Sequence, residues 1–439
     1  MKNIKKKKIL QQPVYRDQEA LNEVLREISL LPPLVFPGEI AKLRLQLCDA
    51  EKGGRFILQG GDCAEKFIDC RETAILNKLK ILLQMSVVLT YGAKKPVIKL
   101  GRIAGQYSKP RSNDFENIAG KEIPVYRGDS INGYEADSFK REPDPARLLE
   151  AFYRSAVTLN YLRSAISGGF ADLHHPDNWS LDSFRDTDSW GKYSGIIDRI
   201  KDSLEFMESI GGVMKDSVGS TDFFISHEGL QLDYEAAVSR INTETGNYYN
   251  SSAHMLWIGE RTRFLDSAHV DYFSKIENPV GIKFSSKADV DELIEIIKIL
   301  NPENETGKIV LIHRFGVTEI SKLENYISKI RNKKFNLSWC SDPMHGNIKS
   351  AGGIKTRDFS DILSELKSAF EIHSKLKSNL SGVHFELTGD EVTECVGGTS
   401  DIGHADLSQN YETYCDPRLN YSQSMEMAFL ISQMLSSKK

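Results

Sequence analysis

Apolar residues occur along the chain in two alternating patterns: short continuous runs, and longer segments in which they recur every three or four positions. Short runs bounded by Gly, Pro, Asn or Asp are typical of buried parallel strands, and the longer spacing is typical of helices. Strands are predicted at 56–61, 96–101, 222–227, 254–259, 280–284, 309–315, 337–340 and 383–387. Helices are predicted at 72–91, 146–166, 288–300, 319–330, 358–376 and 422–436. Eight βα units in series predict an α/β fold of the (β/α)8 TIM-barrel type.

Two segments exceed a minimal barrel. The first fifty residues carry an amphipathic pattern at 17–28, and the long connection between the second and third strands contains a helical pattern at 193–210. A structureless connection of that length would be unusual. We therefore expect an N-terminal extension (1–50) with a role in assembly or regulation, and a catalytic barrel (51–439) that includes a helical insertion at about 170–220.

The composition excludes several classes of protein. The chain has 439 residues and a formal net charge of −5, whereas general binders of nucleic acid or anionic membranes carry an excess of Lys and Arg. The longest apolar stretch, 81–91, is too short to span a bilayer, and no apolar segment follows the basic residues 1–8 as in a secretory signal. The six cysteines are scattered without a CxxC pair, which indicates a reducing, cytoplasmic setting.

Ionisable residues lie at or just after the end of most predicted strands. They are Asp62 and Cys63, Arg102, Glu260 and Arg261, Lys283, His313 and Arg314, Asp342 and His345, and His384 and Glu386. The carboxyl ends of the strands of a βα barrel meet at one face, where active sites are built. Because burying so many ionic groups is costly unless ligands or metals compensate them, we expect a polar active site there.

A first subset of these residues is cationic. It contains Arg102, Arg261, Lys283 and Arg314, joined by the loop residues Lys109, Arg111 and Ser112. Guanidinium groups bind phosphate and carboxylate in bidentate fashion, so this subset predicts a site for phosphorylated substrates.

A second subset mixes a thiol, an imidazole and two carboxylates. Its members are Cys63, His345, Glu386 and Asp416. This set of ligands suits a divalent Mn, Co, Fe or Zn ion.

Each of these residues also has a purely structural interpretation. A lone cysteine such as Cys63 is more often a small buried apolar residue, and Asp416 before a proline could begin a turn. Glu386 could pair with a nearby cation, and the segment 352–356 lacks the complete phosphate-loop pattern and is interpreted as a surface turn. The position of the arginines at the ends of different strands favours a shared pocket over a solvated face.

Several longer segments resemble one known family. They are LQGGDCAE at 58–65, GRIAGQYSKPRS at 101–112, SHEGLQLDYE at 226–235, WIGERTR at 257–263, DPMHGN at 342–347, VHFELTG at 383–389, ECVGG at 394–398 and CDPRLN at 415–420. The chain resembles, over nearly its whole length, the type II (plant-like) 3-deoxy-D-arabino-heptulosonate 7-phosphate (DAHP) synthases. The resemblance implies a transferase that condenses phosphoenolpyruvate with erythrose 4-phosphate, the first step of the shikimate route to aromatic compounds.

The resemblance also implies roles for individual positions. Cys63, His345, Glu386 and Asp416 match the metal ligands, which usually hold Mn or Co. Arg102, Glu260, Arg261, Lys283 and Arg314 match the phosphoenolpyruvate site, and Lys109, Arg111 and Ser112 match the loop that meets erythrose 4-phosphate. Lys109, Glu260 and Lys283 are the expected catalytic residues, with Glu260 near the attacking water and Lys109 as the proton donor. Mn2+ is the expected cofactor, with Co2+, Zn2+ or Fe2+ as alternatives.

Other properties follow from the same resemblance. A homodimer or homotetramer is expected, with chorismate mutase as a further partner. Cys415, beside Asp416, could form a disulfide with Cys63 when metal is absent. The competing functions are a secondary-metabolism variant (an amino-sugar or phenazine-type enzyme), a non-catalytic regulatory partner of chorismate mutase, and a divalent-metal hydrolase. The regulatory partner would lack ligands or arginines, and the hydrolase would have fewer phosphate-binding cations.

Overall fold

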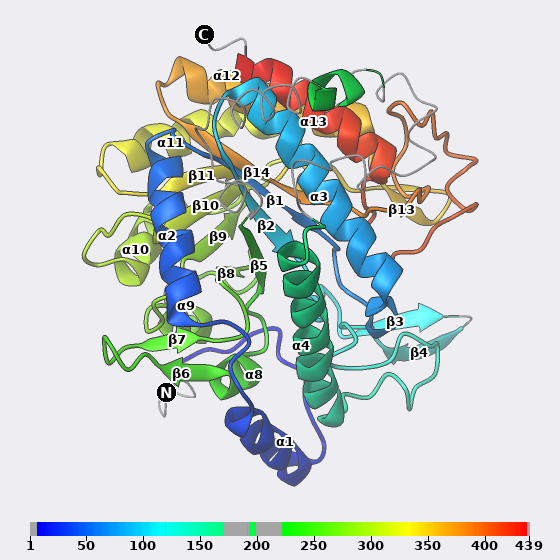
Figure 1. Cartoon of the computed structure of the whole chain (residues 1–439). Helices are drawn as coiled ribbons and strands as arrows, with labels where there is room; N and C mark the ends of the chain where they lie inside the picture. The colour runs from blue at the N-terminus through cyan, green and yellow to red at the C-terminus, as the bar shows by residue number, and fades with distance from the viewer. Residues whose placement is uncertain (1–6, 119, 171–190, 192, 199–221, 437–439) are drawn as a thin grey trace.

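A closed barrel of eight parallel strands forms the centre of the protein (Figure 1). The structure is a computed structural model that describes residues 7–118, 120–170, 191, 193–198 and 222–436. The strands are β1 (Phe56–Gly61), β2 (Val97–Arg102), β5 (Phe223–Glu228), β8 (Met255–Ile258), β9 (Val280–Phe284), β10 (Ile309–His313), β11 (Ser338–Ser341) and β14 (Leu380–Glu386). Neighbours in the barrel follow chain order, and β1 pairs with both β2 and β14 to close it. The predicted barrel is confirmed, and each predicted strand overlaps one observed strand.

Helices surround the barrel, and six of them overlap the predicted ranges: α3 (Glu72–Ala93), α4 (Ala146–Ser167), α10 (Val290–Leu300), α11 (Leu323–Arg331), α12 (Phe359–Lys375) and α13 (Tyr421–Ser436). Two short helices, α8 (Leu232–Ala237) and α9 (Ala268–Phe273), were not predicted. The boundaries follow local chemistry: α10 begins where the Asp289 side chain accepts from the N–H groups of Asp291 and Glu292. The helix predicted at 319–330 is divided into a 3-10 turn, η4 (Ile320–Lys322), and α11.

Helix α3 is long and apolar enough to cross a membrane by length and composition, with a hydropathy of 1.3 over its most apolar window. In the fold, 67% of that window is buried, and α3 packs against α13, β1 and β2. Its apolar character is accounted for by these contacts.

The N-terminal residues share the core of the barrel. Helix α2 (Pro37–Glu51) places Leu43 and Leu47 in one cluster with residues near the starts of the strands, such as Ile57 and Ile98. Helix α1 (Gln18–Leu30) packs instead against α4 and α8. The two helices of the extension therefore pack against different parts of the barrel domain, and the role of the extension in assembly or regulation stays a prediction.

The connection between β2 and β5 contains a hairpin that the sequence pattern does not predict. Its strands are β3 (Phe115–Ile118) and β4 (Lys121–Pro124), both largely exposed. Most of the predicted insertion at 170–220 lies outside the described residues. Residues 193–198 are helical, and their Tyr193 and Ile197 side chains join the main core.

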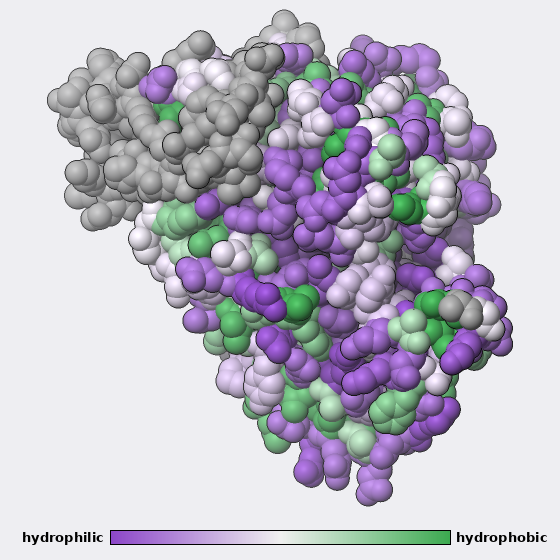
Figure 2. Space-filling view, turned by 90° about the vertical axis from the view of Figure 1, so that its right-hand side faces the viewer, coloured by the Kyte–Doolittle hydropathy of each residue, from purple (hydrophilic) through white to green (hydrophobic). Residues whose placement is uncertain are grey.

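Two further hairpins follow the barrel strands: β6 (Ser239–Ile241) with β7 (Tyr248–Asn250), and β12 (Lys349–Ala351) with β13 (Ile354–Thr356). Figure 2 shows the face on the side of β3, β4 and α4, where hydrophilic residues predominate and hydrophobic ones form small separate groups. The residues that carry chemistry are instead buried at the carboxyl end of the barrel.

Candidate active site

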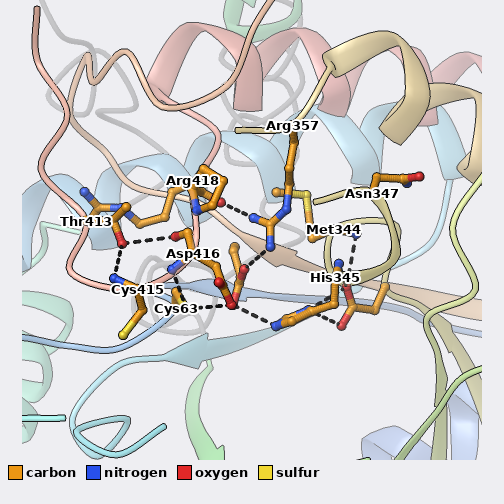
Figure 3. Close-up of polar contacts among 12 residues, drawn as sticks. Cys63, Met344, His345, Asn347, Arg357, Thr413, Cys415, Asp416 and Arg418 are labelled. Carbon is orange, nitrogen blue, oxygen red and sulfur yellow. Dashed lines mark hydrogen bonds and ion pairs between the residues drawn. The ribbon is translucent and has the colours of Figure 1, made fainter. Parts of the chain in front are cut away.

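Three predicted metal ligands converge at the carboxyl end of the barrel (Figure 3). Ligand atoms of Cys63, Glu386 and Asp416 all lie within 4.8 Å of one another, and the three residues are buried. They come from the end of β1, the end of β14 and the segment before α13. His345, the fourth, lies beside this group with Nε2 2.9 Å from Glu386 Oε1. Chain segments more than 300 residues apart thus form one cluster, because the first and last strands of the barrel are neighbours.

The chemistry of this cluster fits a cation. The Lys109 ammonium lies among the three ligands, 2.6 Å from Cys63 Sγ, 2.7 Å from Asp416 Oδ2 and 3.4 Å from Glu386 Oε1. Burial by itself would lower the pKa of Lys109, but the carboxylates of Asp416 and Glu386 outweigh it and raise that pKa well above the ordinary lysine value. A group of donor atoms that holds one positive charge in this way can hold a divalent ion.

The thiol environment is consistent with a metal ligand. Burial raises the pKa of the Cys63 thiol well above its ordinary value, so a bound cation would be needed to stabilise the thiolate. Cys63 and Cys415 are both buried, and neither forms a disulfide in this structure. The disulfide between them stays a prediction.

Surrounding residues hold the ligands in place. The carboxylate of Asp342 accepts from His345 Nδ1 at 2.8 Å, which leaves Nε2 directed at Glu386. Arg357, fully buried, donates to Glu386 Oε2 at 2.6 Å and also to the carbonyl of Pro417. Arg357 was not predicted, and because it lies outside the strands no periodic pattern marked it.

The cationic residues form a second group beside the first. Arg102 Nη1 lies 2.8 Å from His384 Nε2, and Lys283 Nζ lies 3.0 Å from Asp342 Oδ2. Both cations lie over the Trp257 ring, at 5.3 and 5.2 Å from its centroid. Burial lowers the pKa of Lys283 to about 8, although Asp342 partly offsets this effect.

Two other predicted substrate residues extend this group. Arg314 is half-buried, and its Nη2 donates to the His345 carbonyl at 3.2 Å. Glu260 accepts from Ser285 Oγ at 3.1 Å and lies 3.6 Å from Arg263. The structure therefore brings Arg314 to the metal-ligand segment and Glu260 to the rim formed by β8 and β9.

The predicted second-substrate loop lines an open pocket of about 260 Å³. The lining residues are Lys109, Pro110, Arg111, Ser112, Asn113, Phe115, Glu116, Val125, Arg261, Lys355 and Asp416. Arg261 Nη2 donates to Ser112 Oγ at 2.9 Å across it. Lys355 lies 3.1 Å from Asp416 Oδ1 and comes from β13. The segment interpreted as a surface turn forms a hairpin whose turn contains Gly352 and Gly353, at φ of 56° and 86°, and it brings Lys355 to the pocket.

Glu228 is a further site residue that sequence reasoning missed. It ends β5, is 9% exposed, and has Lys283, Lys109, Arg261 and Arg102 as its charge neighbours. Burial raises its carboxyl pKa, and these cations partly offset the rise. Its position at the end of a predicted strand, in the segment SHEG, could have identified it as a candidate site residue. Gly259 accommodates it, because an added Cβ there would lie 2.0 Å from Glu228 Oε1.

His313 is placed differently from the other strand-end residues. It is fully buried and lies against His373 of α12 and Phe315, outside the barrel lumen. Burial lowers its pKa to about 3, so it is a neutral packing residue.

Some of the buried polar atoms that have no hydrogen-bond partner lie at this face, and others lie elsewhere in the protein. Within the described part of the chain those at this face include Arg102 Nε, Glu228 Oε1, Glu260 Oε2 and Arg314 Nε. Such atoms are rare in folded proteins and indicate that a polar ligand completes the site. Fold and site together define a class: a (β/α)8-barrel enzyme with a buried thiol–imidazole–carboxylate cluster next to a pocket lined by several cationic side chains.

Comparison with known proteins identifies the family. A model of the class-II DAHP synthetase family matches residues 1–432, and the chain belongs to this family. Proteins named phospho-2-dehydro-3-deoxyheptonate aldolase from Neurospora crassa and Streptomyces coelicolor are each 47% identical to it, over 97% of this chain and 92% and 94% of their own lengths. One from Mycolicibacterium smegmatis is 42% identical over 98% of this chain and 93% of its own.

A solved structure of phospho-2-dehydro-3-deoxyheptonate aldolase from Francisella tularensis is similar in fold. It aligns with a TM-score of 0.51 and 14% identity, covering 98% of this chain and all of that one. At this identity the likeness supports the barrel fold alone.

Proposed function

We propose that this protein is a 3-deoxy-7-phosphoheptulonate synthase that condenses phosphoenolpyruvate with erythrose 4-phosphate, giving DAHP and phosphate. Membership of the family and the names of its relatives support this reaction. The observation that carries the proposal is the set of unpartnered buried atoms on Arg102, Glu228, Glu260 and Arg314, next to Lys283. The phosphate and carboxylate oxygens of the substrates would accept from the Arg102 and Arg314 nitrogens, and the reacting water would donate to a glutamate oxygen.

We propose that Cys63, His345, Glu386 and Asp416 hold a divalent metal, Mn2+ in the first place, with Co2+, Zn2+ or Fe2+ as alternatives. A metal here supplies Lewis-acid polarisation of the aldehyde oxygen of erythrose 4-phosphate. The mixed thiol, imidazole and carboxylate donors and the Lys109 ammonium among them support this assignment.

The chain's own residues would then act as follows. Arg102, Lys283 and Arg314 bind the carboxylate and phosphate of phosphoenolpyruvate, while Arg111, Ser112 and Arg261 bind the phosphate of erythrose 4-phosphate. Because these side chains are held in fixed positions, they lower the entropic cost of orienting two substrates for reaction. As C3 of phosphoenolpyruvate attacks the aldehyde carbon, Lys109 Nζ delivers a proton to the aldehyde oxygen. Lys355 adds a positive charge on the second-substrate side of the pocket.

Attack leaves positive character at C2 of phosphoenolpyruvate, where water adds and gives a proton to the glutamate carboxylate that holds it. The hemiketal then collapses with cleavage of the C–O bond and release of phosphate. The sequence-based candidate to hold this water is Glu260. Glu228 is the second candidate, favoured by its burial and by the four cations around it, whereas Glu260 contacts Ser285 and Arg263.

The test follows the absorbance of phosphoenolpyruvate on addition of erythrose 4-phosphate, in the presence of EDTA or of Mn2+. We expect loss of absorbance with stoichiometric phosphate, abolished by EDTA and restored by Mn2+. Cys63→Ala should lose both activity and Mn2+ binding, while Cys48→Ala, on α2, should keep both. Folded protein that consumes no phosphoenolpyruvate with any divalent metal would overturn the proposal.

The two carboxylates are distinguished by substitution. We expect the variant that lacks the water-binding carboxylate, Glu228→Gln or Glu260→Gln, to lose kcat by about 100-fold or more while it still binds phosphoenolpyruvate. If both variants show an equal and small loss of kcat, neither carboxylate holds the reacting water.

Partners and setting are part of the proposal. We propose a homodimer or homotetramer in the cytoplasm, with chorismate mutase as a further partner and residues 1–50 and 170–220 in assembly or regulation. The scattered cysteines support a reducing compartment.

Two experiments test the remaining parts of the proposal. Light scattering that gives a monomer at every concentration would reject the oligomer. Activity measured on a panel of aldose substrates would separate this function from the secondary-metabolism variant.

A further inference from the structure

The chain from Lys8 to Tyr15, here called the N-terminal strap, lies across the carboxyl end of the barrel. Lys8 pairs with the connection after β8: its N–H donates to the Asp266 carbonyl at 3.3 Å, and its carbonyl accepts from Ala268 at 3.0 Å. The strap then runs to α1, as Figure 1 shows. This is the end of the barrel that carries the candidate active site.

The strap also contacts the connection after β5. The Gln12 side chain donates to the Leu230 carbonyl at 2.7 Å and accepts from the Leu232 N–H at 3.1 Å. Tyr15 donates from its hydroxyl to Gln231 Oε1 at 3.3 Å. Three contacts therefore fix the strap immediately after the strand that ends in Glu228.

A further contact of the strap reaches the second-substrate loop. Gln11 Oε1 accepts from the Arg111 N–H at 2.8 Å, between residues 100 positions apart in sequence. Arg111 lies between Lys109, at the metal-ligand cluster, and Ser112, which accepts from Arg261. The Gln11 side chain is thus attached to the main chain of the loop that lines the 260 Å³ pocket.

Gln11 holds an unfavourable backbone conformation. Its φ is 63°, in the left-handed region, where a residue with a Cβ is less stable by about 1–2 kcal/mol than in the right-handed region. Glycine would adopt this φ without penalty, but it has no side chain to reach Arg111. Strained residues of this kind persist where surrounding contacts determine their conformation, often near functional sites.

We propose that Gln11 is a positioning residue for the second substrate: through the Arg111 N–H it fixes the loop at 109–112 in the conformation that binds erythrose 4-phosphate. This inference rests on the proposed function, because that function defines what the loop binds. Misplacement of a substrate-binding group by about 1 Å is enough to cost a large factor in rate. The strap, anchored at the connections after β5 and β8, would give the loop a rigid attachment.

The test uses Gln11→Gly, which keeps the left-handed backbone and removes the acceptor, and Gln11→Glu, which keeps an acceptor oxygen. Asn304→Gly is the matched control: Asn304 also has positive φ, at 50°, and its Oδ1 accepts from the Asn336 N–H at 2.8 Å. Asn304 precedes β10, at the opposite end of the barrel.

Hydrogen exchange of the Arg111 amide is the first readout, and it does not depend on activity. We expect faster exchange in Gln11→Gly, near-normal exchange in Gln11→Glu, and no change in Asn304→Gly. Steady-state kinetics is the second readout. Gln11→Gly should raise KM for erythrose 4-phosphate about tenfold, as expected for one lost hydrogen bond, and leave KM for phosphoenolpyruvate within twofold.

Several outcomes would overturn the inference. If the Arg111 amide exchanges at the same rate in Gln11→Gly as in the wild type, Gln11 does not protect that amide. If both KM values rise equally, the substitution has loosened the whole active site and not the loop at 109–112 in particular. If the wild-type protein shows no condensation, the proposed function fails, and the exchange data still decide whether Gln11 holds the loop.

Discussion

Asp62 and Arg418 form a buried ion pair that joins the two chain segments carrying Cys63 and Asp416. Arg418 Nη1 donates to Asp62 Oδ1 at 2.6 Å, and both side chains are at most 5% exposed. Lys78 also pairs with Asp62, and Glu394 pairs with Arg418 at 2.7 Å. Together they form a buried chain of two acids and two cations, in the order Lys78, Asp62, Arg418 and Glu394, next to two of the proposed metal ligands.

Asp62→Asn is therefore expected to weaken metal binding. The substitution leaves Lys78 and Arg418 buried with one acid fewer, at a cost of about 3–5 kcal/mol in stability, and it frees the two ligand segments to move apart. We expect Mn2+ affinity, measured by calorimetry on metal-free protein, to fall about 10–100-fold. Asp49→Asn, which breaks the exposed pair with Arg55, is the control and should change neither quantity. A folded Asp62→Asn variant with wild-type affinity would contradict the positioning role.

Lys283 should control the pH dependence of phosphoenolpyruvate capture. Its pKa of about 8 means that the free enzyme loses this positive charge as pH rises through 8. We expect kcat/KM for phosphoenolpyruvate to be constant below pH 8 and to fall about tenfold per pH unit above it. The kcat profile should break at higher pH, because bound phosphate stabilises the ammonium form. Lys283→Arg should move the break in kcat/KM to much higher pH, because a guanidinium stays charged there, and an unmoved break would assign it to another group.

His313 should make the fold sensitive to acid. Its pKa is about 3 in the folded protein, against 6.5 for an ordinary histidine, so the unfolded chain binds one more proton between these values. The contribution of neutral His313 to the free energy of unfolding is fully present above pH 6.5 and is lost as pH falls. At pH 5 the loss is about 2 kcal/mol. His313→Phe, which keeps an aromatic ring against Phe315 and His373, should show a correspondingly smaller loss of stability between pH 7 and 5.

Urea unfolding of metal-free protein at the two pH values provides this measurement. The exposed His404→Gln should behave as the wild type does. If His313→Phe loses as much stability as the wild type, the histidine is not the acid-sensitive group.

The stack of Tyr134 on Tyr414 should order the segment that carries Asp416. The two rings are parallel within 2°, with centroids 3.7 Å apart, and Tyr414 directly precedes Cys415. Tyr134→Ala removes an aromatic pair that contributes about 1 kcal/mol beyond burial, so we expect faster hydrogen exchange at residues 413–418. Tyr134→Phe keeps the ring and should retain slow exchange. Equal exchange in both variants would show that the stack does not restrain this segment.

Much of the fold could be predicted from local sequence. Strands of a parallel barrel are buried on both faces, so they appear as continuous apolar runs that need no knowledge of their neighbours. The β3–β4 hairpin was missed because its residues are mostly exposed and polar, and they give neither a run nor an alternation. Candidate site residues could be found because a parallel barrel brings every strand end to one face.

His313 and His384 show that the sequence pattern does not predict which face of a buried strand a side chain occupies. Both lie near the carboxyl ends of strands, but His384 contacts Arg102 and Gln59 in the lumen while His313 packs against α12. Successive side chains of a strand point to opposite faces. When both faces are buried, the pattern does not say which residues face the lumen.

The sequence by itself determined the barrel, the chemical character of its carboxyl end, and the two groups of residues proposed to bind a metal ion and the anionic substrates. Only the tertiary structure decided which distant segments meet there: Gln11 with Arg111, Asp62 with Arg418, and Glu228 among the cations. The physical reason is the difference in sequence separation between the two kinds of interaction. Strands and helices are specified by periodicities over a few residues, whereas these contacts join positions separated by up to 356 residues and depend on the conformations of loops that have no period.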